Sequence, residues 1–146
     1  MSDRQPATVT VFYDSDCGFC KVCVGVLLQW DRGRRVYPAA IQGSEGEALL
    51  AALASPERLR SAHLVTARGK LLSGGEAAPE LLRQLPVGRP LGVLAAAMMP
   101  LTKLAYNLLT RLRSVVGPAL PESWRRRAEV LIETRRRGTM PPTAAR

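Results

Sequence analysis

A strand pattern runs directly into a helical pattern near the start of the chain. The segment 8–13 alternates its side chains and is rich in β-branched and aromatic residues, which is typical of a strand. After a short Asp-Ser-Asp turn, apolar residues recur from Gly18 to about Trp30 with the spacing of a helix. Asp and Ser side chains accept hydrogen bonds from the first turn of a helix, so this turn predicts a helix N-terminus. A strand leading into a helix is the first unit of an α/β fold.

The rest of the chain predicts a small mixed sheet followed by helices. Further strands are expected at 35–39, 62–66 and 70–72, the last two forming a hairpin. Pro38 indicates that its strand ends there or lies at an edge of the sheet. Helical spacing occurs at 45–54, 76–85, 90–99, 101–115 and 122–135. This order predicts the α/β class with a helical C-terminal extension.

Length and charge divide the chain into a body and a basic tail. A length of 146 residues favours one domain over two. We expect residues 1–120 to form this domain, including its C-terminal helices, and residues 121–146 to form a basic helical or flexible tail. The chain has 21 Lys+Arg against 12 Asp+Glu, and seven Arg with only three Glu lie in this tail.

Two Arg triplets give the tail its charge: Arg125, Arg126 and Arg127, and then Arg135, Arg136 and Arg137. One interpretation is a surface for anionic lipid or another anionic partner. The other is a solvated face that is balanced by Glu122, Glu129 and Glu133. No recognisable nucleic-acid-binding module accompanies the triplets, so we predict no specific nucleic acid partner.

All three cysteines, Cys17, Cys20 and Cys23, lie within seven residues. An odd number of clustered cysteines indicates redox chemistry or metal binding rather than a disulfide framework. The first ten residues contain no apolar run, so no secretory signal peptide is expected. The apolar run at 91–101 is too short to span a bilayer. We therefore expect a cytoplasmic location, where thiols are kept reduced.

The predicted helix gives its three thiols different surroundings. Cys17 lies at the helix start and off the apolar stripe, Cys20 lies at the edge of the stripe, and Cys23 lies inside it and is expected in the core. The helix dipole and the free N–H groups of the first turn lower the pKa of a thiol there, from about 8.5 to about 7 or lower. The spacing allows a Cys17–Cys20 or a Cys20–Cys23 disulfide equally, whereas exposure and dipole position favour the first.

Acidic residues next to the first cysteine have two opposite effects. A carboxylate of Asp14 or Asp16 would raise the pKa of the Cys17 thiol. The same carboxylate can accept a proton during thiol–disulfide exchange. The role of these residues is left open by the sequence.

A metal site is the weaker interpretation of the cysteine cluster. The Cys-x-x-Cys-x-x-Cys spacing matches part of an iron–sulfur signature, which requires a further cysteine. A zinc site with three cysteines would need His63, the only histidine, and this residue lies in a predicted strand. We therefore expect no metal and no organic cofactor.

The apolar helices after residue 90 also allow two interpretations. The run at 91–101 and the leucine-rich stripe at 101–116 most simply pack over the sheet as core. The alternative is a surface for a peripheral membrane contact or a partner helix. Such a surface would place the cysteines near a membrane-bound substrate.

The junction Asp14-Ser-Asp-Cys17-Gly-Phe-Cys20, between a strand and a helix, resembles the DCC thiol-disulfide oxidoreductase family, which is named for an Asp-x-x-Cys-x-x-Cys motif. The strand pair and small-residue turn at 62–77 are similar to the family's hairpin. The segment from Met99 to Arg111 resembles its C-terminal helices. The resemblance covers roughly residues 9–118.

This resemblance implies a thioredoxin-like fold, with a small mixed sheet flanked by helices, and a role in thiol–disulfide exchange. It implies that Cys17 is the attacking thiol, Cys20 the resolving thiol and Asp14 the acid of the motif. The substrate is then a thiol or disulfide on a protein or a small molecule. Ser61 and Ala62 occupy the stretch where thioredoxin-like enzymes usually carry a cis-proline facing the cysteines, and Cys23 is additional to the motif.

Two hypotheses on function follow from the sequence. The first is a thiol-disulfide oxidoreductase in which Cys17 attacks a disulfide and Cys20 resolves the mixed disulfide. The second is a non-enzymatic interaction or metal-binding module that uses the cysteine cluster and the basic and apolar C-terminal helices.

Overall fold

The alternating run near the start of the chain forms the central strand of a sheet. In the computed structural model, which describes residues 5–142, β2 (Val9–Tyr13) is buried along its whole length. It pairs in parallel with β3 (Val36–Ala40) and antiparallel with β4 (His63–Thr66), and β4 pairs antiparallel with β5 (Leu71–Ser73). The strand order is β3-β2-β4-β5, which places Pro38 on an edge strand as expected.

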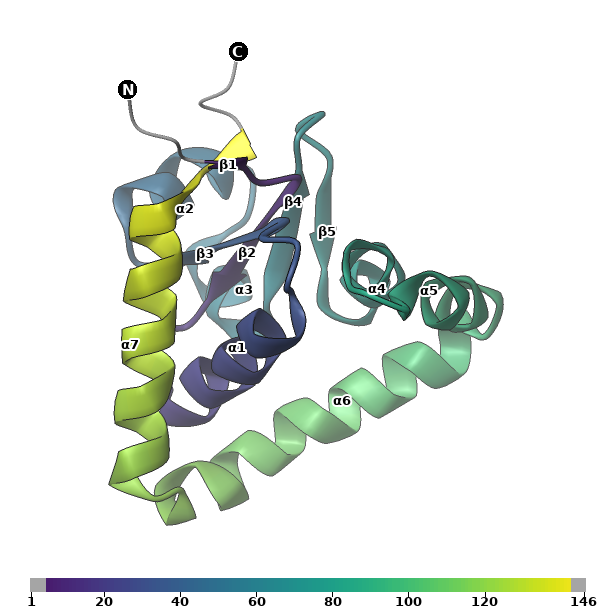
Figure 1. Ribbon diagram of the computed structural model, residues 1–146. Helices are drawn as coiled ribbons and strands as arrows, with labels where there is room; N and C mark the ends of the chain where they lie inside the picture. Colours follow the sequence, from purple (N-terminus) through teal and green to yellow (C-terminus); the bar gives the residue numbers. More distant parts are fainter. Residues whose placement is uncertain (1–4, 143–146) are drawn as a thin grey trace.

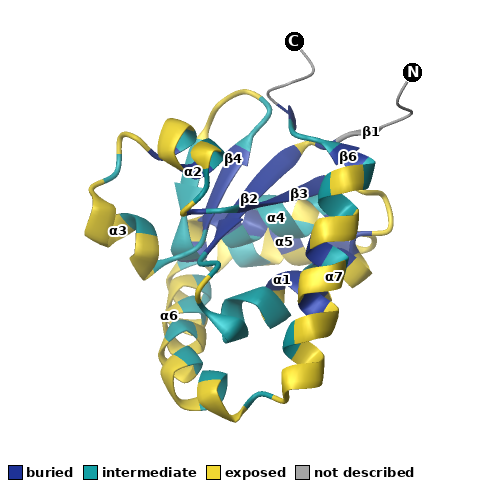
Figure 2. Cartoon of the chain, turned by 90° about the vertical axis from the view of Figure 1, so that its left-hand side faces the viewer, coloured by how far each residue is buried: buried dark blue, intermediate teal, exposed yellow. Residues whose placement is uncertain are grey.

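Helices cover both faces of this sheet, as Figures 1 and 2 show. α1 (Gly18–Trp30) and α7 (Glu122–Gly138) lie on one face, and α2 (Ser44–Leu49) and α3 (Ser55–Arg60) lie on the other. Successive side chains of a strand point to opposite faces, so Val11 packs with Leu28 of α1 while Phe12 packs with Leu50, next to α2. The mixed sheet between helical layers confirms the expected α/β, thioredoxin-like fold.

Two of the expected helices are each replaced by a pair of shorter elements. The helix expected at 45–54 ends at Leu49, and the unexpected α3 follows it. Leu50 is completely buried, and Pro56 in the first turn of α3 starts a new helix because proline fits the first turn of a helix but not its interior. The helix expected at 76–85 begins as a 3₁₀ turn, η1 (Gly74–Ala77), and continues as α4 (Ala78–Gln84).

The long apolar helices do not form core. α5 (Gly88–Ala97) and α6 (Met99–Val116) lie at the side of the sheet, and most of α6 is exposed or half-buried (Figure 2). Five of its exposed apolar residues recur three or four positions apart, and we name them the leucine ridge: Leu101, Leu104, Leu108, Leu112 and Val115. The expectation of core packing is therefore wrong, because α6 packs through another side, mainly against η1.

No single helix among residues 5–142 is long and apolar enough to cross a membrane. α5 and α6 reach the required length and composition only as a pair, and they are bent by 104° at their junction.

The last helix packs against the first one through small residues. α7 lies along α1, and a Cβ atom on Gly25 would lie 3.0 Å from the Cβ atom of Ala128. Ile132 of α7 joins the same core as Leu28. After α7, β6 (Thr139–Met140) pairs in parallel with β1 (Gln5–Pro6) (Figure 1). The last four residues of the expected tail lie outside the described residues, and the division at residue 120 stays a prediction.

A buried ion pair ties α7 to the end of α1. The Asp31 carboxylate is completely buried and accepts hydrogen bonds from the backbone N–H groups of Arg35 and Val36. It also pairs with the guanidinium of Arg135, which donates to the carbonyl oxygens of Leu28 and Asp31 as well. Arg135 is thus a structural residue and is not free to bind an anionic partner.

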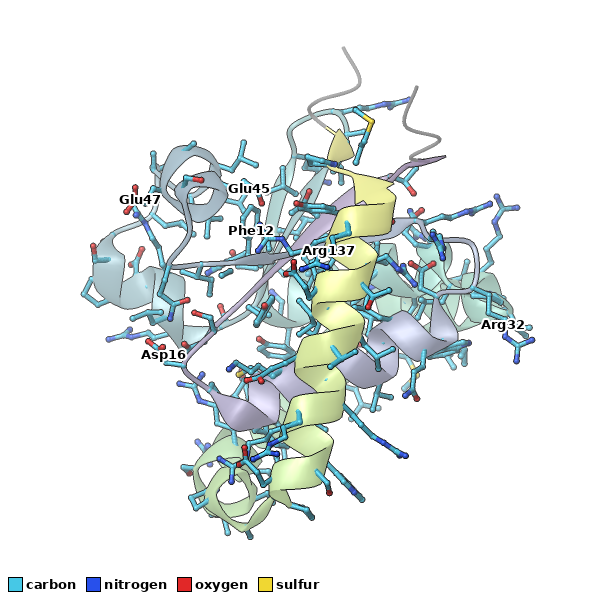
Figure 3. The ribbon with its side chains drawn as sticks, turned by 60° about the vertical axis from the view of Figure 1, so that its left-hand side comes forward. Phe12, Asp16, Arg32, Glu45, Glu47 and Arg137 are labelled. Atoms are coloured by element: carbon cyan, nitrogen blue, oxygen red, sulfur yellow. The ribbon has the colours of Figure 1, made fainter. Side chains whose placement is uncertain are left out.

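The other Arg residues of the triplets lie nearer the solvent. Arg126 pairs with Glu122 and Arg137 with Glu133, both one turn away on the exposed side of α7, and Figure 3 labels Arg137 there. Arg136 is half-buried, with its guanidinium 5.9 Å from the centre of the Tyr37 ring. These contacts agree with the interpretation of a charged face balanced by nearby glutamates.

Candidate active site

Cys17 is the residue at which α1 begins, as the sequence predicts. It is the N-cap of the helix, and its sulfur accepts a hydrogen bond from the backbone N–H of Cys20 at 3.3 Å. Its own backbone N–H donates to the carbonyl oxygen of Asp14, which closes the turn between β2 and α1. The free N–H groups of the first helical turn point toward this end of the helix, so the sulfur lies at the positive end of the helix dipole.

Cys20 lies one turn further along and is half-buried. Burial raises the pKa of its thiol to about 12, and the hydrogen bond and negative charge of Cys17 act in the same direction. Cys20 is therefore a protonated thiol at neutral pH.

Cys23 is exposed, so the expectation that it belongs to the core is wrong. The buried face of α1 consists instead of Val24, Gly25 and Leu28, because the helix packs against the sheet on one side and against α7 on another. Val26 is 61% exposed although it belongs to the apolar stripe seen in the sequence. Apolar spacing alone thus gave the wrong orientation for this helix.

Gln42 fixes the turn that carries the acidic residue of the motif. Its Nε2 donates to Oδ1 of Asp14 at 2.6 Å, and its Oε1 accepts from the backbone N–H of Ser15 at 3.1 Å. Oδ1 of Asp14 also accepts from the backbone N–H of Asp16 at 3.0 Å, and Figure 3 shows Asp16 in this turn. Sequence reasoning missed Gln42. The signal was its place just after β3, because parallel strands bring their carboxyl ends to the same edge of a sheet.

A small apolar pocket of about 100 Å³ opens beside Cys20 and Cys23. Asp14 lies at its wall, and α6 supplies Tyr106 and Arg113. The Tyr106 hydroxyl accepts a hydrogen bond from the backbone N–H of Ala62 at 2.8 Å. Burial raises the pKa of this phenol, so Tyr106 is neutral. Neither Tyr106 nor Arg113 was predicted as a site residue, because only the fold brings α6 next to the cysteines.

Comparison with known proteins agrees with this geometry. A family model described as DCC1-like thiol-disulfide oxidoreductase matches residues 11–117. The chain belongs to this family. The matched part of this DCC1-like protein contains Asp14, Cys17 and Cys20 and ends just after α6, so α7 lies outside it. Searches of curated proteins and of solved structures gave no significant match.

The histidine of this DCC1-like chain, His63, is held inside the fold by hydrogen bonds. His63 is buried in β4, with Nε2 2.9 Å from the carbonyl oxygen of Arg58 and Nδ1 2.7 Å from the Ser73 hydroxyl. A carbonyl oxygen only accepts, so Nε2 carries the proton, and burial lowers the pKa of the ring. Within residues 5–142, no group of three or more His, Cys, Asp or Glu side chains is placed to hold a metal ion.

Proposed function

We propose that this protein exchanges electrons between its own dithiol and a substrate disulfide, with Cys17 as the attacking thiol and Cys20 as the resolving thiol. The observation that carries the proposal is the hydrogen bond from the Cys20 N–H to the Cys17 sulfur at the start of α1. It supports these roles, because the Cys17 sulfur lies at the positive end of the helix dipole and Cys20 keeps its proton. Membership of the DCC1-like family supports the same class of reaction.

The reaction proceeds in two exchanges. The Cys17 thiolate attacks one sulfur of the substrate disulfide, which breaks that bond, forms a mixed disulfide and releases one thiolate. Cys20 then loses its proton and attacks the Cys17 sulfur, which forms the Cys17–Cys20 disulfide and releases the second thiolate. Two electrons pass from the protein to the substrate. Asp14 lies at the wall of the pocket beside Cys20, and we assign it as the acceptor of the Cys20 proton.

The raised pKa of the Cys20 thiol predicts the order in which the two cysteines are alkylated. At pH 8 the fraction of thiolate at Cys20 is far below that of an ordinary thiol, because its pKa is raised to about 12. We expect iodoacetamide to modify Cys17 more than about tenfold faster than Cys20, and the rate at Cys20 to rise steadily up to pH 11. Mass spectrometry of quenched samples measures both rates. Equal rates at the two cysteines would contradict the proposed roles.

The leucine ridge favours a second function, which is binding to an anionic membrane surface. The segment from Gly88 to Leu120 contains Arg89, Lys103, Arg111 and Arg113 and no acidic residue. Arg111 is exposed on the helix that carries the ridge. An apolar helix face flanked by cations fits a bilayer of anionic lipids. We propose that the protein docks there through α6 from the cytoplasm, where clustered thiols stay reduced.

Vesicle binding tests this second function. We expect sedimentation with phosphatidylglycerol vesicles but not with phosphatidylcholine vesicles, and Leu108→Glu should lower the bound fraction more than about tenfold. Val130→Glu is the matched control, because Val130 is exposed to a similar degree (65% against 59%) but lies on α7. Binding that is equal for both lipids, or unchanged in Leu108→Glu, would refute docking through the ridge.

A further inference from the structure

Arg113 places a positive charge without a salt bridge at the pocket that Cys20 lines. Its side chain lies at the wall of this pocket together with Cys20, Asp14 and Tyr106. It makes one long hydrogen bond, 3.4 Å, to the carbonyl oxygen of Leu59. Among residues 5–142, no carboxylate forms a salt bridge with it, whereas Lys103 on the same helix pairs with Glu76. A half-buried guanidinium without an acidic partner is available to a carboxylate of a ligand.

The volume and the lining of the pocket suit a small apolar group. Its volume of about 100 Å³ is somewhat below that of a cavity of about 150 Å³ that holds benzene. Aromatic and aliphatic side chains line it, including Phe19 and Leu109. The pocket therefore encloses one short apolar group or part of a ring, close to both the guanidinium of Arg113 and the carboxylate of Asp14, which lines the same pocket.

The backbone next to the pocket is closed to pairing with an extended peptide. The N–H of Ala62 donates to the Tyr106 hydroxyl, and its carbonyl oxygen accepts from the backbone N–H of Gly74. β4, which follows Ala62, already has a strand on each side. Addition of a peptide strand needs free N–H and C=O groups, which this segment lacks. This favours a small substrate over an extended protein segment.

We infer that this pocket selects a low-molecular-weight disulfide that carries a carboxylate, with its apolar part between α1 and α6 and its carboxylate on Arg113. This inference rests on the proposed function. In the first exchange, Cys17 bonds to the half of the substrate that lies in the pocket, and the other half leaves as a thiolate. Cys20, at the wall of the same pocket, then attacks Cys17 and releases the bound half.

Two aromatic disulfides, one anionic and one neutral, test the inference. 5,5′-Dithiobis(2-nitrobenzoate) carries a carboxylate on each ring, and 4,4′-dithiodipyridine is neutral at pH 7.5. With the reduced full-length protein in 0.15 M salt, we expect Arg113→Gln to slow the reaction of the carboxylate probe about tenfold and that of the neutral probe less than twofold. Arg113→Lys should restore part of the rate with the carboxylate probe, because it keeps the charge.

The matched control is Arg32→Gln, which removes the same charge from an exposed position just after the far end of α1. It should change neither rate more than twofold. Equal slowing of both probes by Arg113→Gln, or no slowing of either, would overturn the inference while leaving the dithiol chemistry intact. Failure of the unmodified protein to react through Cys17 with either probe would instead refute the proposed function. Circular dichroism confirms that each variant is folded.

Discussion

Replacement of Cys17 by serine is expected to abolish exchange, lowering the rate of disulfide reduction by at least about three orders of magnitude. A serine hydroxyl at the start of α1 keeps the capping position but supplies no thiolate, which is the nucleophile of the reaction. Replacement of Cys20 by serine should instead leave the first exchange intact and stop the second. The mixed disulfide on Cys17 then accumulates and is visible by mass spectrometry as the added mass of one substrate half.

Cys23→Ser is the matched control for both variants, because Cys23 lies on the same helix and next to the same pocket. We expect it to retain most of the activity. Full activity of Cys17→Ser would refute the assigned nucleophile. A trapped adduct on Cys23 rather than on Cys17 would show that the third cysteine, which is exposed, is the attacking residue.

Replacement of Arg135 by alanine is expected to lower the free energy of unfolding by about 3–5 kcal/mol, which is typical when one partner of a buried ion pair is removed. The change leaves the completely buried carboxylate of Asp31 without its counter-charge. It also removes the donor to the carbonyl oxygens of Leu28 and Val36. Urea denaturation followed by circular dichroism measures the loss.

Arg137→Ala is the control for this prediction, because Arg137 lies two residues away and its pair with Glu133 is exposed. Exposed pairs one helical turn apart contribute about 0.3–0.5 kcal/mol, so this variant should unfold near the same urea concentration as the unmodified protein. Arg135→Lys, which keeps the charge but loses the planar fork of donors, should lie between the two. A loss in Arg135→Ala no larger than in Arg137→Ala would contradict the structural role of the pair.

Sequence patterns over a few neighbouring residues predicted the positions of the first helix and of the sheet strands. The helix at Gly18–Trp30 and its start at Cys17 are found where the sequence places them, and the four sheet strands begin and end within one residue of the expected segments. Capping chemistry and alternation act over a few residues, so they can be detected in a single sequence. The assignment of Asp14, Cys17 and Cys20 as site residues came from the resemblance to a family, and it stays a prediction.

Contacts between distant segments could not be predicted in this way. The orientation of α1 depends on α7, whose Ala128 lies against Gly25, and no local pattern encodes that packing. The contact of Gln42 with Asp14 and the placement of Arg113 beside Cys20 likewise depend on the fold. Leucines on α6 have the spacing of a buried stripe, although the sheet leaves them uncovered.

The pairing of β1 with β6 has a practical consequence for measuring the reduction potential of the dithiol. β1 precedes the amino end of β2, and Cys17 follows its carboxyl end, so both paired terminal strands lie at the opposite end of the sheet from the cysteines (Figure 1). An anchor attached beyond either strand would hold the protein on a solid surface with its cysteines on the side that faces the solution. Immobilised molecules can then be equilibrated with small thiols and disulfides of known reduction potential, which reach the dithiol without hindrance from the surface.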